Sequence, residues 1–141
     1  MLTKFSLHDS GAETATGTGT PVAIPFSGLD YAVFQLNLTA AATQAGDTLD
    51  VYVQSTVDGT NWVDIVHFNQ IVGNGGAKRY FAKHAYSNTE AMFENASTLA
   101  AGSVRQIFGS QYRCRWAITD TSTQDASFTF SLIMLGIGPS E

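Results

Sequence analysis

The side chains that could do metal chemistry are few, and their spacing does not group them. The three histidines, His8, His67 and His84, have no second His, Cys, Asp or Glu three or four residues away on a predicted helix. The ligand spacing of a helical metal site is therefore missing. Asp64 precedes His67 by three residues, and a regular strand would point these two side chains to opposite faces. The sequence predicts surface or half-buried histidines and no metal site.

A nucleophilic thiol is the next possibility, and Cys114 is the single cysteine of the chain. It lies between Tyr112 and Trp116 on the inward side of a predicted strand, where a thiol behaves as a small hydrophobe. A catalytic thiolate needs an accessible, electropositive position, and the neighbouring Arg113 and Arg115 point away. We therefore interpret Cys114 as a core residue. One cysteine allows no intramolecular disulfide, which fits folding in a reducing compartment.

Four carboxylates surround one predicted hairpin: Asp47, Asp50, Asp58 and Asp64. Paired carboxylates can serve as general acid and base, and a carboxylate-rich loop can bind calcium. The spacing does not match an EF-hand loop, however. Asp47 and Asp58 occupy turn positions, where Asp accepts from nearby backbone amides, and Asp50 lies on an outward face. We predict structural roles for these residues and no catalytic, metal or cofactor site, so an enzyme is not expected.

Basic and aromatic side chains leave two binding interpretations open. Arg113 and Arg115 could form a basic patch with three other cations, which are Lys78, Arg79 and Lys83. Such a patch would pair with the acidic excess of the chain or form salt bridges between subunits. Exposed tyrosines could stack on sugar rings, which keeps a carbohydrate-binding module as an alternative; the candidates are Tyr31, Tyr52 and Tyr80. The net charge of −5, with seven Lys and Arg residues, argues against nucleic acid, because each phosphate contact needs a cation.

The elements that must position these residues are strands. The chain of 141 residues fits one domain. Apolar and polar side chains alternate over residues 31–39, 48–56, 111–119 and 126–135, as expected of strands with one buried face. Asp58-Gly59 lies between the run 48–56 and residues 61–68, which are predicted to return as its partner strand, and so indicates a hairpin. The pattern predicts an all-β fold, an antiparallel β-sandwich or jelly-roll-like barrel of seven to eight strands.

The remaining segments are less regular. Residues 10–20, rich in Gly and Thr, are predicted to be a flexible loop or an arm that orders against a neighbouring chain. Residues 87–101 are either one short helix, which Ser87 and Glu90 would begin as a capping box, or an irregular excursion. No run reaches the roughly 18 apolar residues of a membrane helix, and no secretory signal is recognisable at the start. The expected core is Phe34, Leu36, Leu38, Leu49, Val51, Val53, Trp116, Ile118, Phe128 and Phe130.

Two blocks of the sequence resemble small structural proteins encoded among the head genes of tailed phages. The first block comprises residues 47–55 (DTLDVYVQS), 58–65 (DGTNWVDI) and 67–68 (HF). The second comprises residues 109–116 (GSQYRCRW) and 127–131 (SFTFS), with Cys114 at the usual valine position. With the gaps inside them, the two blocks span residues 47–68 and 109–131, about a third of the chain.

The resemblance implies a virion structural protein, and within that class a capsid decoration (cement) protein. Such a protein would be made in the host cytoplasm and would lie on the capsid surface. Its expected partners are the major capsid protein and further copies of itself, most simply as a trimer, with no nucleic acid and no membrane. Its action would be passive, with no cofactor and no turnover. The alternatives are another virion component, such as a tail, neck or fibre-attachment protein, and the carbohydrate-binding module.

Overall fold

A computed structural model of the chain describes residues 2–24, 29–85, 92–95, 98–107, 109–121 and 125–138. This part contains eleven strands, and seven of them have six residues or more. The long strands are β1 (Leu2–Glu13), β4 (Tyr31–Ala40), β5 (Thr48–Thr56), β6 (Trp62–His67), β8 (Lys78–Ala85), β10 (Gln111–Thr119) and β11 (Phe128–Ile137). The short strands are β2 (Gly17–Thr18), β3 (Val22–Ala23), β7 (Ile71–Val72) and β9 (Ser103–Val104).

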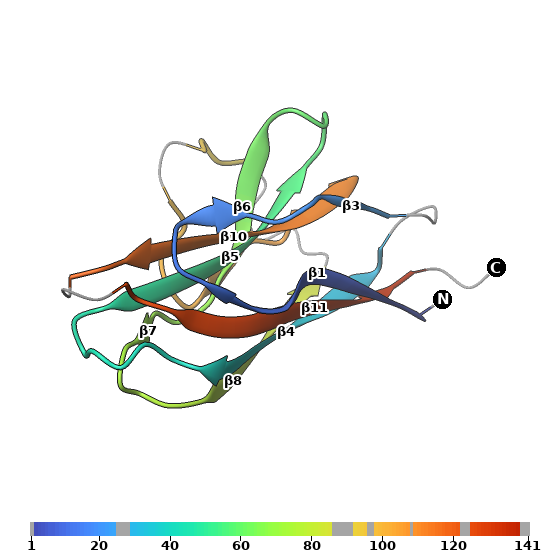
Figure 1. Cartoon of the computed structure of the whole chain (residues 1–141). Coiled ribbons are helices and arrows are strands. Elements are labelled where there is room, and N and C mark those ends of the chain that lie inside the picture. The colour runs from blue at the N-terminus through green and yellow to red at the C-terminus, as the bar shows by residue number, and fades with distance from the viewer. Residues whose placement is uncertain are drawn as a thin grey trace.

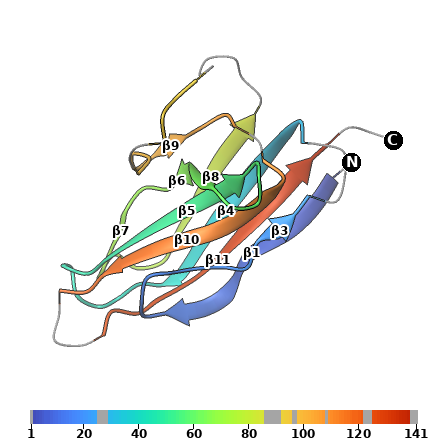
Figure 2. The ribbon, with the colours of Figure 1, turned by 90° about the horizontal axis from the view of Figure 1, so that it is seen from above.

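The strands form two packed antiparallel sheets (Figure 1). The four-stranded sheet has the order β1-β11-β4-β8, and the seven-stranded sheet has the order β2-β10-β5-β6-β9, with β3 paired to β10 and β7 paired to β5. Seen from above, β10 and β5 cross the four-stranded sheet at a small angle (Figure 2), as in aligned sandwiches. The predicted all-β fold is confirmed in its sandwich form.

The core lies between the two sheets, because each long strand turns alternate side chains inward. On β4 and β11 the inward residues are fully buried from Phe34 to Leu38 and from Phe128 to Met134. The facing sheet contributes Leu49, Val51, Val53, Tyr112, Cys114 and Trp116. Of the ten predicted core residues, nine are buried and Ile118 is half-buried against them. Burial of each large side chain stabilises the fold by about 1.5–3 kcal/mol.

A bulge in β6 overturns one expectation from the sequence. Tyr52 pairs with His67 and Val53 with Val66, but Gln54 pairs with Asp64, so Ile65 is an extra residue on β6. A bulge of this kind reverses the alternation of side chains beyond it. Asp64 and His67 therefore point to the same outer face, whereas a regular strand would have separated them.

Residues 10–20 lie along the molecule and lead from one sheet to the other. The indole Nε1 of Trp116 donates to the carbonyl oxygen of Ala15 at 2.8 Å, and the amide of Gly19 donates to the carbonyl oxygen of Cys114 at 2.8 Å. A Cβ at Gly19 would come within 2.8 Å of the carbonyl oxygen of Leu7, so only glycine fits this close approach. The flexibility of the segment stays a prediction, because these contacts describe its position and not its motion.

The candidate helix over residues 87–101 is not formed in the part that the structure describes. Residues 92–95 and 98–100 have no regular secondary structure, and residues 101–102 form a turn. The Ser87–Glu90 capping box lies outside the described residues. Asn95 and Thr98 are weak helix formers, in agreement with the irregular alternative. Among the described helices and strands, no helix has the length and apolar character needed to cross a membrane.

Candidate interaction surfaces

One half of the outer side of the four-stranded sheet is largely apolar, from the row of Leu2, Ile137 and Tyr31 to the row of Ile133 and Phe81, whereas polar residues such as Asn37 and Ser131 occupy the other half. Adjacent strands align Lys4, Leu135, Val33 and Lys83 in one row across the sheet. The next row consists of Ser6, Ile133, Gln35 and Phe81. We call this surface the apolar–basic face; its apolar members are Leu2, Tyr31, Val33, Phe81, Ile133, Leu135 and Ile137, and its basic members are Lys4, Arg79 and Lys83. The solvent side of an antiparallel sheet is usually polar, so this composition is typical of an interaction surface.

Two large side chains of the apolar–basic face are strongly exposed. Leu2 is 65% exposed at one edge of the sheet and Phe81 is 64% exposed at the other. Between them Ile133, Leu135 and Val33 are half-buried by their cross-strand neighbours. Single exposed apolar residues are normal, whereas a contiguous group across four strands marks an interaction site.

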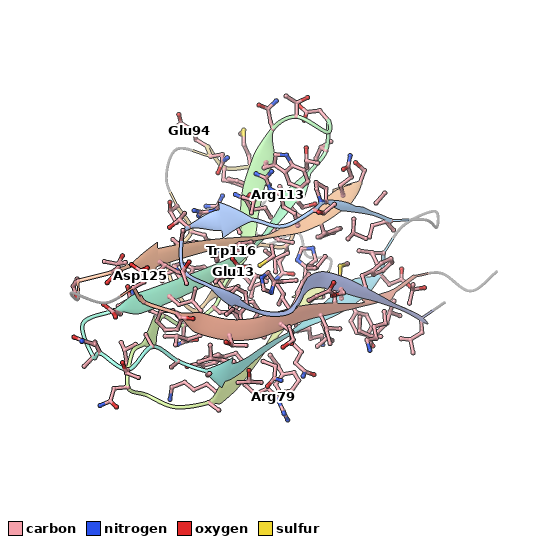
Figure 3. All side chains as sticks on the ribbon, viewed as in Figure 1. Glu13, Arg79, Glu94, Arg113, Trp116 and Asp125 are labelled. Carbon is pink, nitrogen blue, oxygen red and sulfur yellow. The ribbon has the colours of Figure 1, made fainter. Side chains whose placement is uncertain are left out.

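The cations of the apolar–basic face have no acidic partner in the part of the chain that is described. The ammonium of Lys83 lies 5.7 Å from the centre of the Tyr31 ring. Arg79 Nε donates to the Asn37 side-chain oxygen at 3.3 Å, and Figure 3 shows Arg79 projecting from the outer side of this sheet. The three ion pairs found among the described residues all lie elsewhere. These positive charges are therefore available to a partner.

On the outer side of the seven-stranded sheet, by contrast, two arginines lie over aromatic rings of the same sheet. The guanidinium of Arg115 lies 3.7 Å from the centre of the Tyr52 ring and 3.2 Å from Asp64 Oδ2. The Arg113 guanidinium lies 4.1 Å from the centre of the Trp62 ring, and its Nε donates to Gln54 Oε1 at 2.9 Å. These contacts cover the rings, and the carboxylate of Asp64 neutralises Arg115, so these aromatic rings are less available to a partner.

His67 extends the same network to residues 98–107. Its Nε2 contacts Asp50 Oδ1 at 2.9 Å, and its Nδ1 donates to the carbonyl oxygen of Leu99 at 2.7 Å. The ring packs 4.0 Å from the ring of Tyr52. A side chain that is buried and bonded through both nitrogens is a structural clamp. His67 therefore ties the excursion after β8 to the sheet.

The basic patch and the sugar-stacking tyrosines do not assemble as the sequence interpretation required. Arg113 and Arg115 lie on one sheet and Arg79 on the other, so they form no single patch. Tyr52 is only 6% exposed beneath Arg115, Tyr80 packs against the core, and Tyr31 lies on the apolar–basic face. No two of these rings form a platform for a sugar.

The four carboxylates of the hairpin region have separate structural roles. The Asp58 carboxylate accepts from the backbone amides of Thr60 and Asn61 at 2.8 Å each, and these bonds lower the pKa of Asp58, which confirms the predicted turn role. Asp47 is buried and accepts from the amide of Thr121, a distant loop, at 2.9 Å. In the described part, no three His, Cys, Asp or Glu side chains gather closely enough to hold a metal ion.

The other histidines and the thiol lie in the interior. His8 is stacked on Phe130, with ring centres 4.1 Å apart, and contacts Glu13 Oε1 through Nε2 at 3.0 Å. His84 is fully buried, and burial lowers its pKa to about 4. Burial also raises the pKa of the Cys114 thiol, so the thiol stays protonated and unreactive. The interpretation of Cys114 as a core residue is confirmed, and none of the histidines is a surface residue.

A pocket of about 400 Å³ lies beside the tip of the β5–β6 hairpin. Its apolar wall includes Val57, Trp62, Met92, Phe93 and Ile107. Met92 is 90% exposed and Val57 is 76% exposed. Glu94, labelled in Figure 3, stands on the same side of the molecule. The pocket is on the seven-stranded side, remote from the apolar–basic face.

Sequence reasoning did not single out the apolar–basic face, although one signal of it was present. Residues 132–137 are the longest apolar run of the chain. A run without alternation predicts a strand that is apolar on both faces. Leu132 and Met134 enter the core, so Ile133, Leu135 and Ile137 must lie outside it.

The comparisons with known proteins add no relative. No protein-family model matches the chain, and no curated protein is similar to it at a significant level.

Proposed function

We propose that this protein is a virion structural protein, a capsid decoration (cement) protein that binds the assembled major capsid shell through the apolar–basic face. The observation that carries the proposal is the contiguous group of apolar side chains on the outer side of the four-stranded sheet. A sandwich whose core is already closed between the sheets gains little folding stability from apolar residues on its outside, because neighbouring strands bury them only in part. Their placement favours a protein that works by covering a large surface of an assembly.

The resemblance to head proteins of tailed phages supports the major capsid protein as the proposed partner. The first block forms β5, β6 and the hairpin between them, and the second forms β10 and the start of β11. Both blocks lie mainly in the seven-stranded sheet, where they build the Arg–aromatic network. In this proposal they supply a rigid support, and the opposite sheet supplies the contact.

The mechanism needs no reaction. A protein that binds the assembled shell but not its free subunits stabilises the shell by mass action, by about 2.7 kcal/mol per site at a hundredfold excess over Kd. A rigid sheet that spans two neighbouring subunits would resist their separation. Several copies acting together, most simply a trimer, would multiply the effect through effective concentration.

Binding to capsids tests the proposal. The purified chain is mixed with expanded capsids of the major capsid protein encoded in the same genome. Bound copies are located by cryo-electron microscopy, and capsid melting is followed by calorimetry. We expect density on the outer shell and a higher melting temperature. The double variant Phe81→Ser/Leu135→Thr should lose both, because it removes apolar contact area from the face.

A control variant removes an exposed apolar residue elsewhere. Val57→Ser lies at the hairpin tip on the other side of the molecule and should bind like the unmodified chain. Absence of binding to the shell would refute the proposal. Density at the tail, neck or fibres would assign the protein to another virion component instead. Glycan binding without capsid binding would revive the carbohydrate-binding module.

A further inference from the structure

We infer that the partner surface of the apolar–basic face is a protein surface that is acidic as well as apolar. The inference rests on the proposed function and deepens it, because it states which chemistry of the capsid shell the face recognises. Carboxylates of the shell subunits would meet Lys4, Lys83 and Arg79. Apolar shell residues would cover the central strands between them.

Charge is distributed unevenly over the molecule. The chain carries a net charge of −5, yet the strand positions of the apolar–basic face carry three cations and no carboxylate. The rest of the molecule therefore carries −8. The nearest carboxylates lie at the margins of the face. Asp9 accepts from the Ser6 hydroxyl, and Asp30 directly precedes Tyr31.

The cations lie at the edges of the apolar–basic face. Lys4 on β1 and Lys83 on β8 stand at the two ends of one row, with Leu135 and Val33 between them. Arg79 stands two residues from Phe81 on the same side of β8. This is an apolar centre with a charged rim, which is the usual composition of protein interfaces. A phosphate backbone or a sugar would gain little from the leucine and isoleucine side chains in the centre.

A partner that covers the cations removes their hydration, which costs free energy. Lys83 and Arg79 are exposed and have no ion pair within the described residues. A partner that covers them with apolar groups would remove their hydration without compensation. A partner that places carboxylates opposite them would recover this loss and gain association rate. The uncompensated charges thus select an acidic surface.

The same charges argue against a second copy docked face to face. A twofold contact would bring each face onto itself. Lys4, Lys83 and Arg79 of one copy would then meet the same cations of the other, and like charges in contact disfavour association. The occupant we propose is the shell, and association of copies through this face is an outcome that the experiment detects.

Salt dependence of capsid binding by the full chain tests the inference. Raising NaCl from about 0.1 M to about 1 M shortens the Debye length from about 10 Å to about 3 Å. We expect binding to expanded capsids to weaken about tenfold or more over this range. Lys83→Glu should weaken binding about fivefold at low salt, and the difference should shrink at high salt.

Lys78→Glu is the matched control, because it makes the same charge change on the same strand. Lys78 pairs with Leu38, whose side chain faces the core, and its stem lies beside Gly75, so it is not part of the face. Its binding should equal that of the unmodified chain.

The outcomes separate the two proposals. Capsid binding that ignores salt, or equal binding by the Lys83→Glu and Lys78→Glu variants, would overturn the acidic partner and leave the proposed function standing. No binding of the unmodified chain at any salt concentration would overturn the proposed function itself. Sedimentation that shows copies associating without capsids, and separating in the Phe81→Ser/Leu135→Thr variant, would assign the face to a second copy and also overturn the inference.

Discussion

Asp64 and His67 share the outer face of β6, and both are held by partners from β5. Gln54 Nε2 donates to Asp64 Oδ1 at 2.9 Å, and His67 packs on Tyr52 and contacts Asp50. The extra residue Ile65 makes this possible, because it lets Ile65 and Val66 both enter the core. The bulge at Ile65 thus places two apolar side chains in the core and leaves the polar side chains on both sides of them on the outer face.

Arg115→Met should destabilise the protein by about 1–3 kcal/mol, because it leaves the Asp64 carboxylate poorly hydrated and without a cation. The Asp64 side chain is only 11% exposed. Urea unfolding measures the loss. A double-mutant cycle with Asp64→Asn isolates the pair, and a coupling energy of zero would show that the ion pair adds nothing.

Stability should fall as the pH drops from about 6.5 to about 4, in part because of His84. Its pKa is lowered from 6.5 to about 4 by burial, so the unfolded chain takes up a proton over this interval and the folded chain does not. This loss of stability begins below about pH 6.5 and amounts to about 3 kcal/mol at pH 4. Urea unfolding of His84→Gln at several pH values should show a shallower decline. Parallel curves for the two proteins would contradict the assignment.

Cys114 should react with a thiol reagent only when the protein unfolds. The side chain is 0% exposed, and the raised pKa of its thiol suppresses the reactive thiolate. Labelling with Ellman's reagent should be negligible in native buffer and should accelerate with urea in step with unfolding. Cys114→Val should show no labelling and nearly unchanged stability. Rapid stoichiometric labelling of the native chain would refute the buried position.

Gly73→Ala should destabilise strongly, by several kcal/mol, since an added Cβ would overlap the backbone carbonyl of Gln44. Backbone atoms cannot move aside as a flexible side chain can. Gly11→Ala is the comparison, because its Cβ would meet only the carbonyl oxygen of Asp9 at 3.7 Å. Thermal unfolding of both variants checks the contrast. Equal melting temperatures would show that the loop before β5 can shift.

Phe81→Ser should change the free energy of unfolding by less than about 0.5 kcal/mol, as expected of an exposed position. Leu36→Ala, on the neighbouring strand but inside the core, should cost about 2–5 kcal/mol. Urea titrations compare the two. A large loss for Phe81→Ser would mean that this side chain serves the fold, and the apolar–basic face would lose its most exposed member.

Much of the fold could be predicted because strand alternation is a local property. Alternating spacing alone predicts the buried face of three strands, in the stretches from Phe34 to Leu38, from Leu49 to Val53 and from Phe128 to Phe130. The bulge at Ile65 could not be predicted in the same way. It depends on which partner residues β5 places opposite β6, and an added residue in one strand leaves no separate mark in the sequence.

The sequence by itself determined which residues alternate, where the chain turns at Asp58-Gly59, and that its histidines, thiol and carboxylates have no recognised catalytic or metal-site spacing. The tertiary structure alone decided which strands lie side by side, because pairing joins residues as distant as Leu2 and Ile137. That pairing brings Lys4, Leu135, Val33 and Lys83 into one row and places Arg113 and Arg115 on the opposite sheet. Surface chemistry is therefore a property of strand order, which local spacing does not encode.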